Sequence, residues 1–306
     1  MGVIQGSKLG PLLFDCYSND FNLMFENSEC ILYADDTCIV YTGSELSSLC
    51  TYVNEKLSII ENWCNKNKLS LNTCKCEYMV VTTKNTCNEP LLFIGGNQIR
   101  KVEFCKYLGI YIDRNLRFNV QIKQIKIKLS RLCGVAFRLS DLLNFKTARN
   151  FYYSCVYSVL SYCIAVWGGV LECTHRADCL ISLHARIIKL LFSKYYPDGS
   201  CLFKNGKILK LGDIYRLNVS IYMFKVVKLN SCHILRNNLD LTWPEHSYST
   251  RNLNLLIPSF PRVEAIRYNF KHQFIKVWND VPLEIKNENT FRSFKNKLRD
   301  HFLNSY

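Results

Sequence analysis

The apolar positions of this chain follow two spacings. Short apolar runs between polar or glycine residues predict β-strands in the first third of the chain, where each run has the length of a strand. These runs lie at residues 30–32, 37–41, 78–83, 91–94 and 98–100. Longer segments repeat apolar residues every three or four positions, which is typical of amphipathic helices. The helices predicted in this way cover residues 11–25, 43–66, 116–139, 145–170 and 176–192, and residues 201–306 are predicted to be mainly helical.

The segment 116–139 has the clearest amphipathic pattern. Its apolar seam consists of Ile122, Ile125, Leu129, Leu132, Ala136 and Leu139. Its polar positions carry one sign of charge, from Arg117, Lys123, Lys126, Lys128, Arg131 and Arg138, and no Asp or Glu falls between Arg114 and Ser140. A solvated helix face normally mixes signs, and a helix lying on a membrane surface normally carries an exposed aromatic anchor, which this pattern lacks. We therefore favour a surface that contacts a nucleic-acid backbone.

Two adjacent carboxylates, Asp35 and Asp36, stand between the apolar runs at 30–32 and 37–41. These runs predict a β-hairpin with the aspartates at its tip. Like charges at one tip repel each other, whereas a divalent cation there would be held by both carboxylates. An ordinary polar turn is the alternative interpretation, because Asp is common in turns.

A glycine-rich loop precedes the first predicted helix. Gly6 and Gly10 permit backbone conformations that other residues avoid, and Pro11 suits the first turn of a helix. Gln5 and Ser7 add hydrogen-bonding side chains to the same loop, so it is suited to a nucleotide's sugar, base and phosphates. A glycine-rich helix start without a ligand is the alternative.

Charge is divided unevenly along the 306 residues. Residues 1–100 hold seven Lys and Arg against eleven Asp and Glu, a net charge of −4, whereas residues 101–306 hold 32 against 14, a net charge of +18. The acidic part contains the carboxylate pair, and the basic part has the charge that gripping a duplex requires.

The sixteen cysteines lack the paired spacing of zinc sites. Cys74-x-Cys76 and Cys173-x-His175-x-x-x-Cys179, with His184 further on, are the nearest candidates, but buried cysteine is the commoner fate. So many free thiols favour a reducing, intracellular compartment. The longest apolar stretch, 151–170, is interrupted by serines and is predicted to be a buried helix rather than a membrane span, so no membrane partner is expected.

Taken together, several ordered motifs resemble the reverse transcriptase of non-LTR (LINE-type) retrotransposons, nearest the jockey-like group. They are the loop Gly2-x-x-Gln5-Gly6-Ser7-x-Leu9-Gly10-Pro11-Leu12-Leu13-Phe14, the box Tyr33-Ala34-Asp35-Asp36, the segment Leu69-Ser70-Leu71-Asn72-x-x-Lys75-x-x-Tyr78-Met79, the strand Tyr107-Leu108-Gly109-Ile110-x-Ile112-Asp113, and the C-terminal motifs Trp278–Pro282 and Phe291–Lys295.

The resemblance implies RNA-directed DNA polymerisation by a two-metal mechanism. Asp35 and Asp36 would be catalytic ligands of Mg²⁺ or Mn²⁺, and Lys75 would lie near the incoming triphosphate, although a solvated lysine is the alternative. Nucleotide and template contacts would come from Gln5, Gly6, Ser7 and Tyr33, and duplex contacts from Arg117, Lys123, Lys126, Lys128 and Arg131. The implied partners are an RNA template, a DNA primer, the RNA–DNA duplex and deoxynucleoside triphosphates, and no obligate protein partner is predicted. The implied location is the nucleus, with a cytoplasmic ribonucleoprotein stage.

The predicted fold class is α+β. We expect a partial polymerase palm, an antiparallel sheet with helices, at residues 1–106, then a helical thumb and connection at 107–196, and a mainly helical basic domain at 197–306. Since the family's further metal-binding aspartate lies upstream of the Gly6 loop, the chain is expected to be a C-terminal part of an element, inactive alone. A non-catalytic nucleic-acid-binding remnant is the alternative, and a degenerate product without function is a third.

Overall fold

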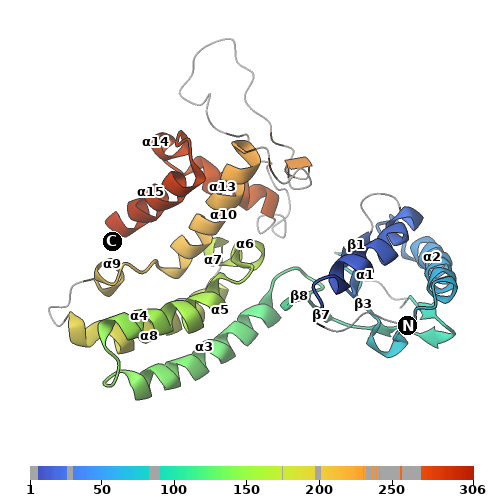
Figure 1. Ribbon diagram of the computed structural model, residues 1–306, viewed down its shortest axis with the longest axis horizontal. Coiled ribbons are helices and arrows are strands. Elements are labelled where there is room, and N and C mark those ends of the chain that lie inside the picture. Colours follow the sequence, from blue (N-terminus) through green and yellow to red (C-terminus); the bar gives the residue numbers. More distant parts are fainter. Residues whose placement is uncertain are drawn as a thin grey trace, which may run out of the picture. The chain divides into compact units, whose positions relative to one another are not determined.

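The computed structural model describes residues 6–25, 30–82, 90–173, 175–196, 201–229 and 270–306, together with 231, 236–237, 239, 241 and 256. The chain forms two compact units, Met1–Cys105 and Lys106–Tyr306 (Figure 1). Gln5, which is predicted to contact nucleotide and template, lies outside the described residues, as do residues 197–200 at the predicted domain boundary. Helices and short two-stranded sheets together agree with the predicted α+β class.

The first unit is organised around one long helix. Its elements are α1 (Gly10–Ser18), the 3₁₀ helix η1 (Asn19–Met24), β1 (Cys30–Tyr33), β2 (Asp36–Ile39), α2 (Leu46–Lys66), η2 (Thr73–Lys75), β3 (Glu77–Tyr78), β4 (Phe93–Ile94), β5 (Asn97–Gln98), β6 (Arg100–Lys101) and the start of β7 (Phe104–Tyr107). Val53, Leu57 and Ile60 of α2 are buried in the core of the unit, with residues of the two hairpins packed around them. The spacing of these side chains by four and three places them on one helix face, as predicted.

Side chains of α2 also hold the hairpin β4–β5. The backbone N–H of Phe93 donates to Asn54 Oδ1 at 2.9 Å, and Asn54 Nδ2 donates to the carbonyl of Leu91 at 3.1 Å. Glu61 Oε2 accepts from the N–H of Gly95 at 3.1 Å, at the Gly95-Gly96 turn between β4 and β5. Both glycines have positive φ, so the turn uses the conformational freedom that glycine provides.

The second unit is a helical assembly around α10 (Leu211–Val227), whose residues are mostly buried. Helix α10 packs against α13 (Phe270–Asn279) and α15 (Phe291–Asn304), while α3 (Asn119–Leu139) runs beside α8 (Asp178–Phe192) (Figure 1). The remaining elements are β8 (Ile110–Asp113), α4 (Phe145–Phe151), the π-helix η3 (Tyr152–Tyr157), α5 (Ser158–Ser161), α6 (Ile164–Trp167), α7 (Val170–Cys173), η4 (His175–Ala177), η5 (Ser193–Tyr195), α9 (Leu202–Asn205) and α14 (Leu283–Lys286). One hydrophobic core joins these helices, and it extends on both sides of residue 197.

Several predicted elements are wrong in extent. The helix predicted at 145–170 contains the π-helix η3 and ends at Ser161, because Cys163 takes a positive φ of 47°. The helix predicted at 43–66 begins at Leu46, with Glu45 rather than Gly43-Ser44 at its N-cap position. The strand at 78–83 reduces to β3 of two residues, which pairs in parallel with β6. The single strand expected at 107–113 is part of the hairpin β7–β8, which turns at Leu108-Gly109.

The helix predicted at 11–25 divides into α1 and η1, and several of its large apolar side chains are exposed. Phe21 and Phe25 are buried, whereas Leu12, Leu13 and Tyr17 are about half exposed and Leu23 is 84% exposed. The change to a 3₁₀ helix after Ser18 accounts only for Leu23, which leaves the face that the α-helical spacing predicts, whereas Leu12, Leu13 and Tyr17 lie in α1 itself. In the part of the chain that the structure describes, no helix is long and apolar enough to cross a bilayer.

Candidate nucleotide and nucleic-acid sites

The carboxylate pair lies at the end of the predicted hairpin. Strands β1 and β2 are antiparallel, and Tyr33 pairs with Asp36. Ala34 and Asp35 therefore form the two-residue turn, in which Ala34 has a φ of 51°, and Asp36 opens β2. Both aspartates are exposed, as is Tyr33, so the tip is open to solvent and to a ligand.

The tip offers two oxygen ligands to a cation. Carboxylate oxygens are the donors that Mg²⁺ and Mn²⁺ prefer, so the residues present fit a weakly held divalent ion. Among the described residues there is no group of three or more His, Cys, Asp or Glu side chains that could hold a metal. A complete cation pair needs further oxygen ligands besides these two aspartates.

Cysteines of the same hairpin do not complete the site. Burial, and then the neighbouring Cys38, raises the pKa of the Cys30 thiol to about 11. Burial also raises the pKa of Cys38. Because the thiolate is the form that binds metals, these cysteines stay protonated near neutral pH and act as core residues.

The glycine-rich loop caps the first helix. Gly6 has a φ of 85°, and Ser7 Oγ accepts a hydrogen bond of 2.9 Å from the N–H of Gly10. An added Cβ at Gly6 would meet nothing within 4 Å, so the residue is required for its conformation and not for space. Ser7 thus has a structural role that the sequence interpretation as a nucleotide contact did not include.

Lys75 ends the short helix η2 and is exposed. Its backbone N–H donates to the carbonyl of Asn72 at 3.1 Å. Within the described ranges no hydrogen bond or ion pair joins Lys75 to Asp35 or Asp36. The lysine is free to contact a ligand, and its assignment to the triphosphate stays a prediction.

The basic side chains of α3 lie on its solvent face. Ile122, Ile125, Leu129 and Ala136 are buried, while Lys123, Lys126, Lys128, Arg131 and Arg138 are exposed, as the seam predicted. In the described part of the chain these five residues have no carboxylate partner. The face therefore carries uncompensated positive charge along a straight helix of 21 residues.

The start of α3 is fixed by residues that sequence reasoning missed. Asp113 is buried, and its two oxygens accept from the N–H groups of Arg117 and Asn119, each at 2.9 Å. Gln121 Oε1 accepts from the N–H of Tyr111 at 3.1 Å and joins the helix to β8. Helix α3 therefore begins at Asn119 and not at Leu116, and Arg117 precedes it. An aspartate a few residues before a basic helix was the available signal.

The aromatic anchor said to be missing from α3 is present. Phe137 near the C-terminal end is 68% exposed, and Leu142 just beyond the helix is 79% exposed. Phe137 follows Ala136 of the buried seam by one residue, a rotation of about 100° round the helix, so it lies beside the seam and not within it. The prediction that this helix lacks an exposed aromatic anchor is therefore wrong, and the argument against the membrane-surface alternative loses that support.

In the part of the chain that the structure describes, the two histidine candidates for zinc have different partners. His175 Nδ1 lies 3.0 Å from Asp178 Oδ2 at the surface. His184 is buried, its Nε2 lies 3.0 Å from Tyr152 Oη, and burial lowers its pKa to about 4. His175 therefore contacts a surface carboxylate, and His184 contacts a buried tyrosine hydroxyl.

The family model for reverse transcriptase (RNA-dependent DNA polymerase) matches residues 1–112, which contain the Gly6 loop and the Asp35-Asp36 hairpin. The chain is similar to reverse transcriptases of mobile elements. It is 26% identical over 224 residues to the RNA-directed DNA polymerase from mobile element jockey of Drosophila melanogaster, covering 69% of this chain and 24% of that protein. It is 29% identical over 220 residues to the probable RNA-directed DNA polymerase from transposon BS of the same fly, covering 67% and 24%.

A third relative is the probable RNA-directed DNA polymerase from transposon X-element of Drosophila melanogaster, 23% identical over 229 residues, covering 72% of this chain and 25% of that protein. These findings confirm the resemblance to non-LTR reverse transcriptases. The reverse transcriptase similarity continues into the second unit, because alignments of this length extend beyond residue 112. The chain spans about a quarter of the length of these curated relatives. No solved structure is significantly similar to it.

Proposed function

We propose that this chain carries part of an RNA-directed DNA polymerase of a non-LTR mobile element. One observation carries the proposal: the segment matching the reverse transcriptase family forms a hairpin whose open end bears Asp35 and Asp36. On this proposal, residues 1–106 belong to the palm, 107–196 to the thumb and connection, and 197–306 to a C-terminal domain. It acts in the nucleus, after a cytoplasmic ribonucleoprotein stage.

In the proposed reaction the 3′-hydroxyl of a DNA primer attacks the α-phosphate of a deoxynucleoside triphosphate paired with an RNA template. Asp35 and Asp36 would hold Mg²⁺ or Mn²⁺. Such ions, when bound, activate the attacking oxygen as a nucleophile and stabilise the negative charge of the leaving pyrophosphate. The exposure of both carboxylates supports this role, because a ligand can reach them.

Around the hairpin, Gln5, Gly6, Ser7 and Tyr33 would position nucleotide and template. The open space at Gly6 and the exposed ring of Tyr33 support these contacts. Lys75 would lie beside the phosphates and supply a proton to the departing pyrophosphate, and its exposed, unpaired ammonium group supports that role.

Helix α3 would grip the template–primer duplex through phosphates. Arg117, Lys123, Lys126, Lys128 and Arg131 are exposed. Binding of this kind releases counterions, so its affinity falls steeply with salt and depends little on base sequence.

Thermal melts with Mn²⁺ test the carboxylate site. Binding to the folded state raises the melting temperature by mass action, and the shift should need roughly millimolar Mn²⁺ because only two carboxylates are present. The shift should be lost in Asp35→Asn/Asp36→Asn and kept in the control Asp15→Asn/Asp20→Asn, which removes the same charge from α1 and η1. Equal shifts in all three proteins would assign the cation to another place and the pair to an ordinary turn.

A salt titration of duplex binding tests α3. Replacing Lys123, Lys126 and Lys128 by alanine should weaken binding and flatten the slope of log K against log salt by up to about one unit per lost contact. Alanine at Arg186, Lys189 and Lys228, three exposed cations elsewhere in the second unit, removes the same charge and should leave the slope nearly unchanged. A slope that is the same in both triple variants would contradict the duplex-grip role.

A non-catalytic nucleic-acid-binding remnant is the second candidate, and the one-signed face of α3 favours it equally. The two tests separate the candidates, since a remnant keeps the salt-dependent binding and shows no Mn²⁺ shift at Asp35 and Asp36.

A further inference from the structure

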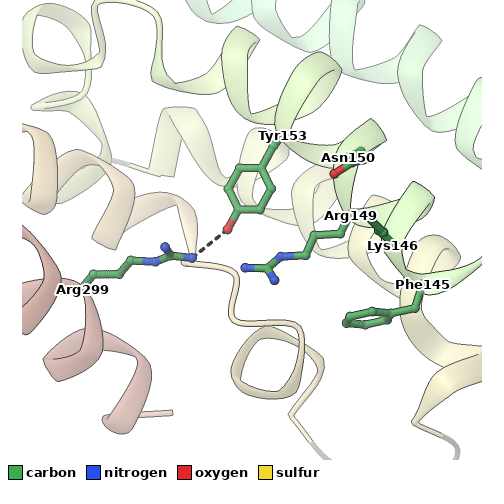
Figure 2. A pocket seen from close by; sticks show the side chains of 6 residues that line it. All are labelled: Phe145, Lys146, Arg149, Asn150, Tyr153 and Arg299. Atoms are coloured by element: carbon green, nitrogen blue, oxygen red, sulfur yellow. Dashed lines mark hydrogen bonds between the residues drawn. The ribbon is translucent and has the colours of Figure 1, made fainter.

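A basic pocket opens on the second unit, and none of the residues assigned above lines it. It has a volume of about 490 Å³ and is lined by Phe145, Lys146, Arg149, Asn150, Tyr153 and Arg299 (Figure 2). The first four residues lie on α4, Tyr153 lies on η3, and Arg299 comes from α15 at the other end of the unit's sequence. A cavity of this size is in the range that holds a small ligand or one unit of a polymer.

The lining carries three cations and no carboxylate. Among the described residues neither Lys146 nor Arg149 has an acidic partner. The guanidinium of Arg149 lies 5.6 Å from the centre of the Tyr153 ring, and in Figure 2 it extends toward the same space as Arg299. Uncompensated positive charges around one concavity attract an anion, and their mutual repulsion is relieved when one binds.

One side of the pocket is held rigidly. Arg299 Nη2 donates to Tyr153 Oη at 2.9 Å and to the carbonyl of Lys207 at 2.8 Å, and Tyr153 Oη donates to the same carbonyl at 3.2 Å. The other guanidinium nitrogens of Arg299 have no partner among the described residues, so they remain available to a ligand. A pre-positioned guanidinium loses little conformational entropy on binding.

The ring of Phe145 closes another side. Its centre lies 5.4 Å from that of Tyr195 and 5.7 Å from that of Phe192, both nearly edge-on. These contacts keep an aromatic surface beside the three cations. Guanidinium groups match phosphate oxygens in a forked geometry, and an aromatic ring offers a stacking surface to a base.

We propose that this pocket binds one nucleotide unit of a single-stranded nucleic acid, with its phosphate between Arg149 and Arg299 and its base toward Phe145. Lys146 and the Asn150 amide contribute at the rim. The site goes beyond the duplex grip of α3, because it is concave, contains aromatic rings and lies on other helices. A strand held here is anchored by residues of the second unit, and its binding does not require Asp35 or Asp36.

Fluorescence anisotropy with a labelled 15-mer of deoxythymidine tests the proposal on the full chain. Lys146→Gln/Arg149→Gln should weaken binding at least fivefold relative to Arg186→Gln/Lys189→Gln, which removes the same charge from exposed positions of α8. Arg299 is left intact, because its hydrogen bonds join α15 to the loop at Lys207. Equal losses in the two double variants would overturn the proposal, and their melting temperatures show that both are folded.

Arginine modification by phenylglyoxal, read by mass spectrometry, locates the contact. The 15-mer should protect Arg149 at least threefold, and protection should persist in the Lys123, Lys126, Lys128 alanine variant, so failure of the α3 grip and failure of this site are distinguishable. Three outcomes would overturn the proposal. Arg149 could stay unprotected, inorganic pyrophosphate could protect it where the 15-mer does not, or only phosphatidylserine vesicles could protect it, which would mean an anionic lipid surface as the partner.

Discussion

Individual residues in the second unit combine burial with polar partners, and His184 is the clearest case. It is 1% exposed, between Tyr152 on one side and the ring of Phe203 at 5.4 Å on the other. Burial lowers the pKa of this histidine to about 4, compared with 6.5 for an exposed one. In the folded protein the ring therefore stays neutral at pH values where the unfolded chain takes up a proton.

Stability should fall as the pH drops through this window. Because the folded pKa lies below the unfolded one, the contribution of His184 is complete above pH 6.5 and decreases toward pH 4, by up to roughly 1.4 kcal/mol per pH unit. Urea unfolding at pH 7, 6, 5 and 4 measures the slope. His184→Gln, which can still bond Tyr152 Oη, should flatten it between pH 6.5 and 4. An unchanged slope would mean that other groups cause the acid sensitivity.

At the residue scale the sequence was informative where chemistry is local. Adjacent aspartates, a glycine-rich loop and a run of cations can be recognised from their neighbours alone, and the aspartates and the cations of α3 are exposed. Gln121 and His184 acquire their roles from partners in other elements of the fold. No spacing rule connects Tyr152 to His184, so such pairs could not be predicted.

Among the elements, two glycines differ in the space around them, and this space decides what an added side chain does to stability. A Cβ at Gly168, after α6, would lie 2.4 Å from the carbonyl oxygen of Ile164 and 2.4 Å from Tyr215 Cδ2. A Cβ at Gly134, inside α3, would meet nothing within 4 Å. The first glycine is required by close packing, and the second only lowers helix propensity.

Alanine at these two positions should change stability with opposite sign. Gly168→Ala should lower the free energy of unfolding by about 3 kcal/mol, because it forces the backbone and Tyr215 apart. Gly134→Ala should raise it by about 0.5–1 kcal/mol through helix propensity. Chemical denaturation of both variants beside the wild type measures the difference. Similar effects at the two positions would contradict the packing at Gly168.

The start of α3 supplies a second test at this scale. Asp113→Ala leaves two backbone N–H groups without their acceptor and should cost about 1–3 kcal/mol. Asp113→Asn keeps one side-chain oxygen and should cost less. Hydrogen exchange of the first turn of α3 should accelerate in the same order. If exchange is unaffected in the alanine variant, another group fixes this helix end.

The extent of elements was predicted well only where one face is uniformly apolar. Helices α2, α3 and α8 each pack one apolar stripe against a core, and they end where their periodicity predicts but begin two or three residues later. The segment after Ser161 breaks where Cys163 has a positive φ, and a cysteine gives no warning of that conformation. Strands β3 to β6 have only two residues each, too few for an alternating pattern to be recognised.

For the whole molecule, the division at Cys105/Lys106 coincides with the change from a net negative to a net positive sequence. The unit with the carboxylate hairpin and the unit with the basic helices therefore have separate cores and opposite charge. That asymmetry was visible in the composition, whereas the single core that joins residues on both sides of 197 was not.

The 306-residue chain alone should extend a primer on an RNA template at a very low rate, if at all. Two-metal catalysis needs more oxygen ligands than Asp35 and Asp36, and among the described residues no group of three or more His, Cys, Asp or Glu side chains could hold a metal. Primer extension with Mg²⁺ and deoxynucleotides measures this. Robust extension that Asp35→Asn abolishes would show that the chain supplies a complete set of ligands.

The π-helix η3 predicts where the lengths of related chains differ. Buried residues recur every four positions through the segment, at Ala148, Tyr152, Val156 and Leu160. In a regular α-helix that spacing drifts by roughly 40° at each step, and the wider π turn absorbs the drift. A π turn contains one residue more than an α turn, and the helices on either side keep their orientation. We expect relatives that are one residue shorter here to have an uninterrupted α-helix, so alignment gaps should concentrate between Phe151 and Ser158.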